Sequence, residues 1–128
     1  MAEKIFKNVV KNDNIDDIIC LSAGLSTING LTASENAVTV CKEIGVNLEG
    51  HLSKSIMDVP LHNVDIFVVM TKSHMDALIK YGVDKAKIYL LGDISDPFGQ
   101  DVSTYRTCRD QIKDEVTKFW NLIKKKLD

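Results

Sequence analysis

The chain has 128 residues, of which 45% are hydrophobic and 27% are charged, a balance that is ordinary for a globular protein and argues against disorder. Sixteen basic residues against eighteen acidic ones leave a net charge of -2, so no basic character points to nucleic acid as a partner. No apolar stretch approaches the roughly 20 residues of a membrane span, and the first residues do not form a signal peptide. We therefore expect no membrane association and a cytoplasmic location.

The length fits one compact domain over residues 1–128. The cysteines, Cys20, Cys41 and Cys108, are odd in number, lie far apart and sit within apolar segments. None has another cysteine at metal-ligand spacing, which favours reduced, buried thiols over a disulfide framework or a zinc site. We expect neither a metal nor a cofactor.

The first segments alternate between helical and extended patterns. Apolar side chains recur on one face of residues 2–12, which predicts a helix, and the breaker run Asn12-Asp13-Asn14 follows it. Residues 18–21 form an apolar run typical of a buried strand. Residues 22–30 contain two glycines but lack the Gly-Lys-Ser/Thr ending of a phosphate loop, which favours a plain strand-to-helix loop.

A second helix is predicted after this loop. Thr32 and Glu35 match the capping-box pattern at its start, and Gly45 is placed to end it.

Further along the chain, residues 66–70 are five consecutive apolar residues, as in a parallel strand buried on both faces. A short helix is predicted over residues 73–81, followed by a buried strand at residues 88–91. Residues 92–101 form a loop, and helical spacing of apolar residues predicts a last helix over residues 102–127.

This order, with helices and strands in alternation, predicts an α/β fold: a doubly wound parallel sheet with helices on both faces. The first helix starts at the first residue, with no capping side chain and no strand ahead of it. Open parallel sheets bind ligands beyond the carboxyl ends of their strands, often at the start of a helix. The place where such a site would be expected is therefore missing from these residues.

Several motifs resemble those of the low-molecular-weight protein tyrosine phosphatases, in the order of that family and over essentially the whole chain. They are Ser22-Ala23-Gly24, Ala33-Ser34-Glu35-Asn36-Ala37-Val38, Gly50-His51-Leu52-Ser53-Lys54, Val69-Met70-Thr71-Lys72-Ser73-His74, Asp96-Pro97-Phe98-Gly99 and Tyr105-Arg106-Thr107-Cys108-Arg109-Asp110-Gln111-Ile112. The resemblance implies substrates that are phosphorylated proteins or small phosphomonoesters.

In that family a cysteine, five residues and an arginine form the phosphate-binding loop between the first strand and the first helix. No cysteine in this chain is followed six positions later by an arginine, and Cys108-Arg109 has the wrong spacing. The resemblance therefore implies an N-terminally truncated member, with a start at Met1 that falls after the first strand and the catalytic loop. We expect this chain to be catalytically inactive.

The resemblance assigns roles to three side chains. Asp96 matches the general acid and base, although an Asp-Pro pair is also a common turn former. Phe98 matches an aromatic residue that flanks the substrate, or it is a half-buried loop anchor. His51 matches a histidine that supports the catalytic loop, or it is a partly exposed loop residue.

An alternative function follows from the missing strand, which in the family lies between its second and third strands. We expect residues 18–21 and residues 66–70 to close up against each other or to recruit another chain, as in an interaction or oligomerisation module. An arsenate reductase of the same fold would need a pair of redox cysteines after residues 66–70, and none is present. Receiver-like and flavodoxin-like domains share the architecture but do not explain the Asp96 loop.

Overall fold

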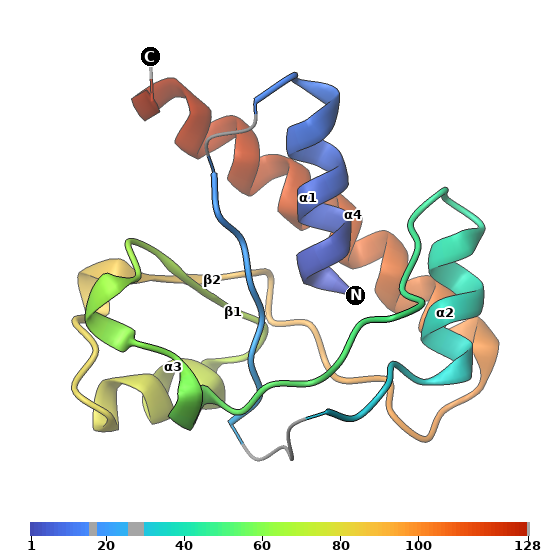
Figure 1. Cartoon of the computed structure of the whole chain (residues 1–128), viewed down its shortest axis with the longest axis horizontal. Coiled ribbons are helices and arrows are strands. Elements are labelled where there is room, and N and C mark those ends of the chain that lie inside the picture. The colour runs from blue at the N-terminus through green and yellow to red at the C-terminus, as the bar shows by residue number, and fades with distance from the viewer. Residues whose placement is uncertain (16–17, 26–29, 128) are drawn as a thin grey trace.

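The computed structural model describes residues 1–15, 18–25 and 30–127. Within these ranges the helices and strands are α1 (Ala2–Asn12), α2 (Glu35–Lys42), β1 (Phe67–Val69), α3 (Lys72–Lys80), β2 (Ile88–Leu90) and α4 (Val102–Leu127), as Figure 1 shows. Short 3-10 helices lie at Ile56–Asp58, Leu61–Asn63 and Lys85–Lys87. The elements predicted from residue 66 onward are confirmed, with small shifts at their ends. None of the helices in the described ranges is long and apolar enough to cross a membrane.

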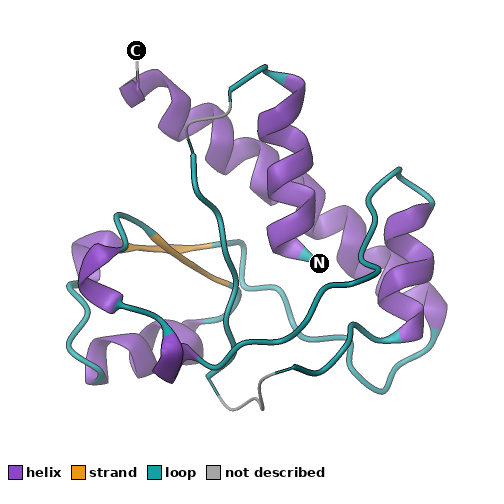
Figure 2. Ribbon diagram, in the orientation of Figure 1, coloured by secondary structure: helices purple, strands orange, loops and turns teal. Residues whose placement is uncertain are grey.

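The two strands β1 and β2 pair in parallel, with Phe67 opposite Ile88 and Val69 opposite Leu90. Helix α3 lies between them in the chain and provides the crossover that a parallel pair needs (Figure 2). The expectation that residues 66–70 are buried on both faces is wrong. Phe67 and Val69 are buried, but Val68 between them is 42% exposed, so one face of β1 is only partly covered.

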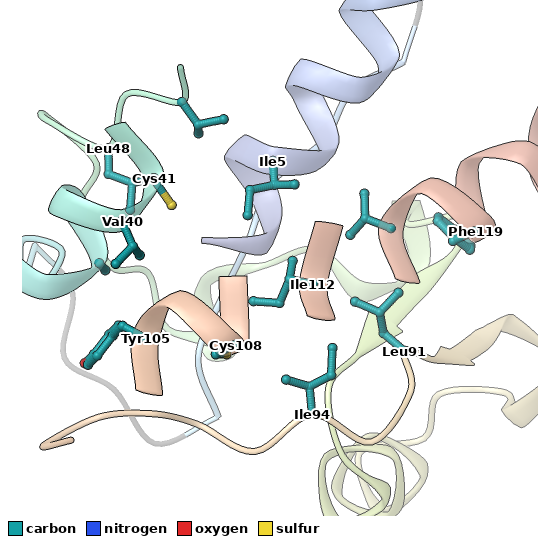
Figure 3. Packing of buried hydrophobic residues seen from close by; sticks show 13 residues of the cluster. Ile5, Val40, Cys41, Leu48, Leu91, Ile94, Tyr105, Cys108, Ile112 and Phe119 are labelled. Carbon is teal, nitrogen blue, oxygen red and sulfur yellow. The ribbon is translucent and has the colours of Figure 1, made fainter. Parts of the chain in front are cut away.

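The long helix α4 carries the main hydrophobic core. Its predicted apolar stripe is buried at Tyr105, Cys108, Ile112, Val116 and Phe119. These side chains pack with residues of α1, of α2 and of the segment after β2 (Figure 3). A second cluster joins β1 to α3 and to the 3-10 helix at Ile56–Asp58. The loop after β2 therefore starts from a well-packed part of the molecule.

Residues 18–21 do not form the strand that their composition predicts. Backbone hydrogen bonds in the described part of this segment begin only at Gly24, whose amide donates to the Lys54 carbonyl oxygen at 2.8 Å. Ile19 is 93% exposed. The expectation that this segment closes up against residues 66–70 is also wrong, because β2 is the described strand that pairs with β1. A strand needs a neighbour that supplies backbone partners, and no described segment does so here.

The starts of the first two helices differ in how they are capped. Met1 precedes α1 without a side-chain cap, as predicted. The predicted cap of the second helix, Thr32, is wrong: Ser34 caps α2, and its Oγ accepts from the Ala37 amide at 3.2 Å. Thr32 forms an isolated antiparallel bridge with Leu52. That bridge keeps Thr32 in the extended chain ahead of the helix, so the next hydroxyl residue becomes the cap.

Candidate functional site

The 92–101 loop joins β2 to α4 at the carboxyl end of the sheet. The Leu91 amide donates to the Val69 carbonyl oxygen at 2.8 Å, and the Ile94 amide donates to the Met70 carbonyl oxygen at 2.7 Å. Leu91 and Ile94 are both buried. These contacts attach the start of the loop to the end of β1, which is the edge where parallel sheets bind ligands.

Asp96 lies in this loop with its side chain exposed. Its Oδ1 accepts a hydrogen bond from the Phe98 amide at 3.0 Å, which forms the turn that an Asp-Pro pair favours. The other carboxylate oxygen, Oδ2, has no hydrogen-bond partner among the described residues. The turn-forming role is therefore seen directly, and it leaves one carboxylate oxygen open for other contacts.

Phe98 follows Asp96 and is 77% exposed, which does not fit the alternative of a half-buried loop anchor. The Gln100 amide donates to the Pro97 carbonyl oxygen at 2.9 Å and closes the turn. Gly99 has φ 80°, in the left-handed region where glycine is favoured. Phe98 thus holds the Asp96 carboxylate through its backbone while its ring remains accessible.

The first turn of α1 forms a second polar centre. The first amides of a helix have no acceptor within the helix, and Met1 provides no side-chain cap for them, so this end carries a partial positive charge. Glu3 lies in this turn: its Oε1 accepts from the Ser22 hydroxyl at 2.6 Å and its Oε2 from the Lys7 ammonium at 2.8 Å. Glu3 therefore ties α1 to the end of the extended segment that precedes Gly24.

His51 is partly buried, within electrostatic range of the N-terminal amine and of Glu3 in the first turn of α1. Burial is the main cause that lowers the pKa of His51, while the Glu3 carboxylate raises it and the N-terminal amine lowers it further. Burial and then the Asp96 carboxylate raise the pKa of Cys108, which the same N-terminal amine lowers. The start of α1 is therefore close to His51, and no described contact joins His51 to Asp96.

Both arginines of the sequence are engaged by the carboxylate of Glu43, the residue that follows the last turn of α2. Arg106 Nη2 lies 2.8 Å from Glu43 Oε2, and Arg109 Nη1 lies 2.6 Å from Glu43 Oε1. Cys108 between them is buried and donates to the Ser95 carbonyl oxygen at 3.7 Å. This geometry agrees with the rejection of Cys108-Arg109 as a phosphate-binding pair. In the described ranges, no group of three or more potential metal ligands lies close together.

Reasoning from the sequence missed the residues that support the 92–101 loop. Asn36 Nδ2, at the start of α2, donates to the Gln100 carbonyl oxygen at 3.2 Å across 64 positions of sequence. The apolar pattern around Cys108 predicts a buried thiol and gives no sign of its contact with Ser95. The one signal in the sequence is that Asn36 belongs to a motif shared with the resembled family, but the motif does not reveal its partner.

The Glu3 contacts make stability depend on pH in the acid range. Partial burial alone raises the pKa of Glu3, but hydrogen bonds from Lys7 and Ser22 outweigh it and lower the pKa from 4.5 to about 2. Because the folded-state pKa is the lower one, Glu3 stabilises the fold above about pH 4.5, and this contribution is lost as the pH falls toward about 2.

We expect Glu3→Gln to lower the free energy of unfolding by about 1 kcal/mol near neutral pH. This value is smaller than the pKa shift alone implies, because solvent around Lys7 screens the ion pair. Near pH 2 the substitution should change the free energy of unfolding little. Urea titrations of both proteins at the two pH values measure this difference. Equal losses at both pH values would contradict the assigned role of the Glu3 carboxylate.

Comparison with known proteins places this geometry in a family. A family model described as low molecular weight phosphotyrosine protein phosphatase matches residues 1–128. The low molecular weight protein-tyrosine-phosphatase PtpB of Staphylococcus haemolyticus is 32% identical over 119 residues, which cover 88% of this chain and 81% of PtpB. The protein-arginine-phosphatase of Bacillus subtilis is 25% identical over 134 residues, which cover 98% of this chain and 88% of that protein.

Solved structures agree with this assignment and with the α/β fold. The crystal structure of a low molecular weight protein tyrosine phosphatase from T. tengcongensis matches with a TM-score of 0.85 and 29% identity, over 94% of this chain and 87% of that one. The solution structure of a low molecular weight protein tyrosine phosphatase from Bacillus subtilis matches with a TM-score of 0.88 and 24% identity, over 99% of this chain and 89% of that one, and supports the fold. The chain belongs to the low molecular weight phosphotyrosine protein phosphatase family.

Proposed function

We propose that Asp96 is the general acid and base of phosphomonoester hydrolysis. In this chemistry a cysteine thiolate attacks phosphorus, the bond from phosphorus to the leaving oxygen breaks, and the acid gives that oxygen its proton. The resulting carboxylate then takes a proton from the water that attacks the phosphocysteine and breaks its S–P bond. The observation that supports this role is the exposed Asp96 carboxylate, oriented through Oδ1 by the Phe98 amide at 3.0 Å, with Oδ2 open for the proton.

We also propose that residues 1–128 alone do not complete this reaction. None of the cysteines is followed six positions later by an arginine. Burial raises the pKa of Cys41 and of Cys108, whereas a nucleophilic thiol needs a lowered pKa. Glu43 accepts hydrogen bonds from both arginines, so neither guanidinium is set to hold a phosphate. The test is the hydrolysis of an aryl phosphate, which this chain should leave at the background rate.

The proposed substrates are phosphorylated proteins or small phosphomonoesters. The relatives are named as phosphatases of protein tyrosine or protein arginine, which supports a phosphorylated side chain as the substrate class. Phe98, with its exposed ring, would flank that side chain, and His51 would support the loop that holds the phosphate. We propose a single domain over residues 1–128 that acts in the cytoplasm, without nucleic acid or membrane partners.

A second candidate function is a non-catalytic interaction or oligomerisation module. The observation that favours it is the apolar segment at residues 18–21, where Ile19 is 93% exposed and Leu21 is 49% exposed. Unpaired extended backbone with exposed apolar side chains is a template for pairing with a second chain. We propose that two copies of this chain pair through this segment.

Under this second candidate, Ile19→Lys should lower the average mass of the chain at high protein concentration. The added charge disfavours the pairing of edge strands, as lysines do in natural edge strands. Light scattering over a concentration series measures the mass. Met57→Lys is the matched control, since Met57 is 76% exposed in the 3-10 helix at Ile56–Asp58. A strict monomer at every concentration would exclude the module.

A further inference from the structure

The 92–101 loop is held by side chains from two other parts of the fold. Cys108 of α4 donates from Sγ to the Ser95 carbonyl oxygen at 3.7 Å. Asn36 of α2 donates from Nδ2 to the Gln100 carbonyl oxygen at 3.2 Å. The two contacts therefore lie immediately before and immediately after residues 96–99, the part of the loop that contains the proposed acid.

The two helices that supply these contacts are fixed to each other. The Ser34 hydroxyl, which caps α2, donates to the Tyr105 hydroxyl of α4 at 3.2 Å. Arg109, 7% exposed, donates to the Val40 carbonyl oxygen at 2.9 Å and to Glu43 at 2.6 Å. Because buried, charge-assisted hydrogen bonds are among the stronger ones in proteins, α2 and α4 form one rigid support. Asn36 and Cys108 thus hold the loop from a common body.

The other hydrogen bonds of the loop cannot replace these contacts. The bond from the Ile94 amide to Met70 attaches the loop to the end of β1 only ahead of Ser95. The bond from the Phe98 amide to Asp96 and the bond from the Gln100 amide to Pro97 both lie inside the turn. They orient the carboxylate relative to the turn, but not the turn relative to the rest of the molecule. A group that transfers a proton has to be held within about 0.5 Å of its productive position. With the Phe98 ring exposed, packing of that ring cannot provide this restraint.

We infer that Asn36 and Cys108 are positioning residues, which fix residues 96–99 against the α2 and α4 body. Their importance for catalysis rests on the proposed role of Asp96 as the general acid. The restraint itself is independent of any reaction and can be measured in this chain. Neither residue contacts the reacting atoms in this proposal; both act through the backbone on either side of the acid.

The first test is amide hydrogen exchange in Asn36→Ala, followed by NMR. Loss of one hydrogen bond should raise the exchange of the Phe98 and Gln100 amides about 5- to 10-fold, while the Val116 amide in α4 stays unchanged. Alanine is a better helix former than asparagine, so α2 itself should not be weakened. Asn47→Ala is the control: it removes the same side chain at a position where Asn47 accepts only a local hydrogen bond from the Glu49 amide at 2.9 Å.

The second test compares two substitutions at Cys108. Cys108→Ala removes the donor and should raise exchange at Phe98, whereas Cys108→Ser keeps a donor and should restore protection. Unchanged exchange in both Asn36→Ala and Cys108→Ala would overturn the inference. Equal exchange in the serine and alanine variants would overturn the role of Cys108. If Cys108→Ala does not fold, Asn36→Ala decides, because its side chain lies at the surface of α2.

The positioning inference and the proposed catalytic role of Asp96 can be contradicted separately. Asp96→Asn should leave the Gln100 amide protected, because the contacts of Asn36 and Cys108 remain. Asp96→Asn can also be made in a version of the chain that carries a relative's catalytic loop ahead of Met1. Full turnover by that variant would contradict the proposed role of Asp96 but not the positioning contacts. Fast exchange of the loop amides in the unsubstituted chain would contradict the positioning contacts but not the proposed role of Asp96.

Discussion

A chimera that carries the first strand and Cys-x5-Arg loop of a relative ahead of Met1 should hydrolyse aryl phosphates, and Asp96→Asn should lower its kcat by about 10²- to 10⁴-fold. Asparagine has nearly the shape of aspartate and can still accept from the Phe98 amide, so the turn is kept. It cannot give a proton to the leaving oxygen. Steady-state kinetics with phosphates of different leaving groups measure the effect.

Three comparisons make this experiment decisive. The 128-residue chain without the graft should show only background hydrolysis if, as proposed, none of its cysteines acts as a nucleophile. The loss in Asp96→Asn should be smaller for a leaving group that departs without a proton. Asp76→Asn, an exposed change on α3, should leave kcat unaltered. Turnover by the ungrafted chain that disappears in Asp96→Ala would contradict the proposed lack of a nucleophile.

The largest loss of stability is expected from Trp120→Ala. Trp120 is 1% exposed, and its ring meets Phe6 of α1 edge-on at 6.1 Å. Its Nε1 donates to Asp13 Oδ2 at 2.6 Å. Truncation removes this packing and hydrogen bond together, so the free energy of unfolding should fall by about 3–5 kcal/mol. Urea unfolding followed by circular dichroism measures this loss without relying on the lost fluorophore.

Two further variants separate the causes of that loss. Trp120→Phe keeps much of the buried area and loses the Asp13 hydrogen bond, so we expect an intermediate loss of about 1–2 kcal/mol. Leu122→Ala, at a position 51% exposed on the same helix, should cost about 0.5 kcal/mol or less. A similar loss for Trp120→Ala and Leu122→Ala would show that α1 does not depend on the Trp120 contact.

The fold could be predicted wherever the local pattern and the available neighbours agree. Helix α4 has the predicted bounds because its apolar stripe finds α1 and α2 to pack against. Residues 18–21 have the composition of a strand but no described neighbour to pair with, so composition alone misled. Thr32 and Ser34 are both suitable caps, and the bridge from Thr32 to Leu52 decides between them. Such pairings are not visible in a local pattern.

The candidate site could be predicted only in part. The Asp96 turn depends only on four consecutive residues, so it can be predicted from the sequence. The exposure of Phe98 depends on what covers the loop, and sequence reasoning left both possibilities open. The contact from Asn36 to Gln100 spans 64 positions and exists only after α2 and α4 have packed. Residues that are distant from the turn in sequence but contact it, such as Asn36, can therefore be identified only from the structure.

The pairing of both arginines with Glu43 has a consequence for anion recognition. A guanidinium binds phosphate through two parallel hydrogen bonds, which a lysine ammonium cannot reproduce. In the described part of the chain, which includes both arginines, Glu43 accepts from each of them. A phosphorylated protein that meets this surface would therefore encounter lysines and backbone amides. The exterior around α2 and α4 should discriminate poorly between phosphate and other anions, and its binding should weaken steeply with salt.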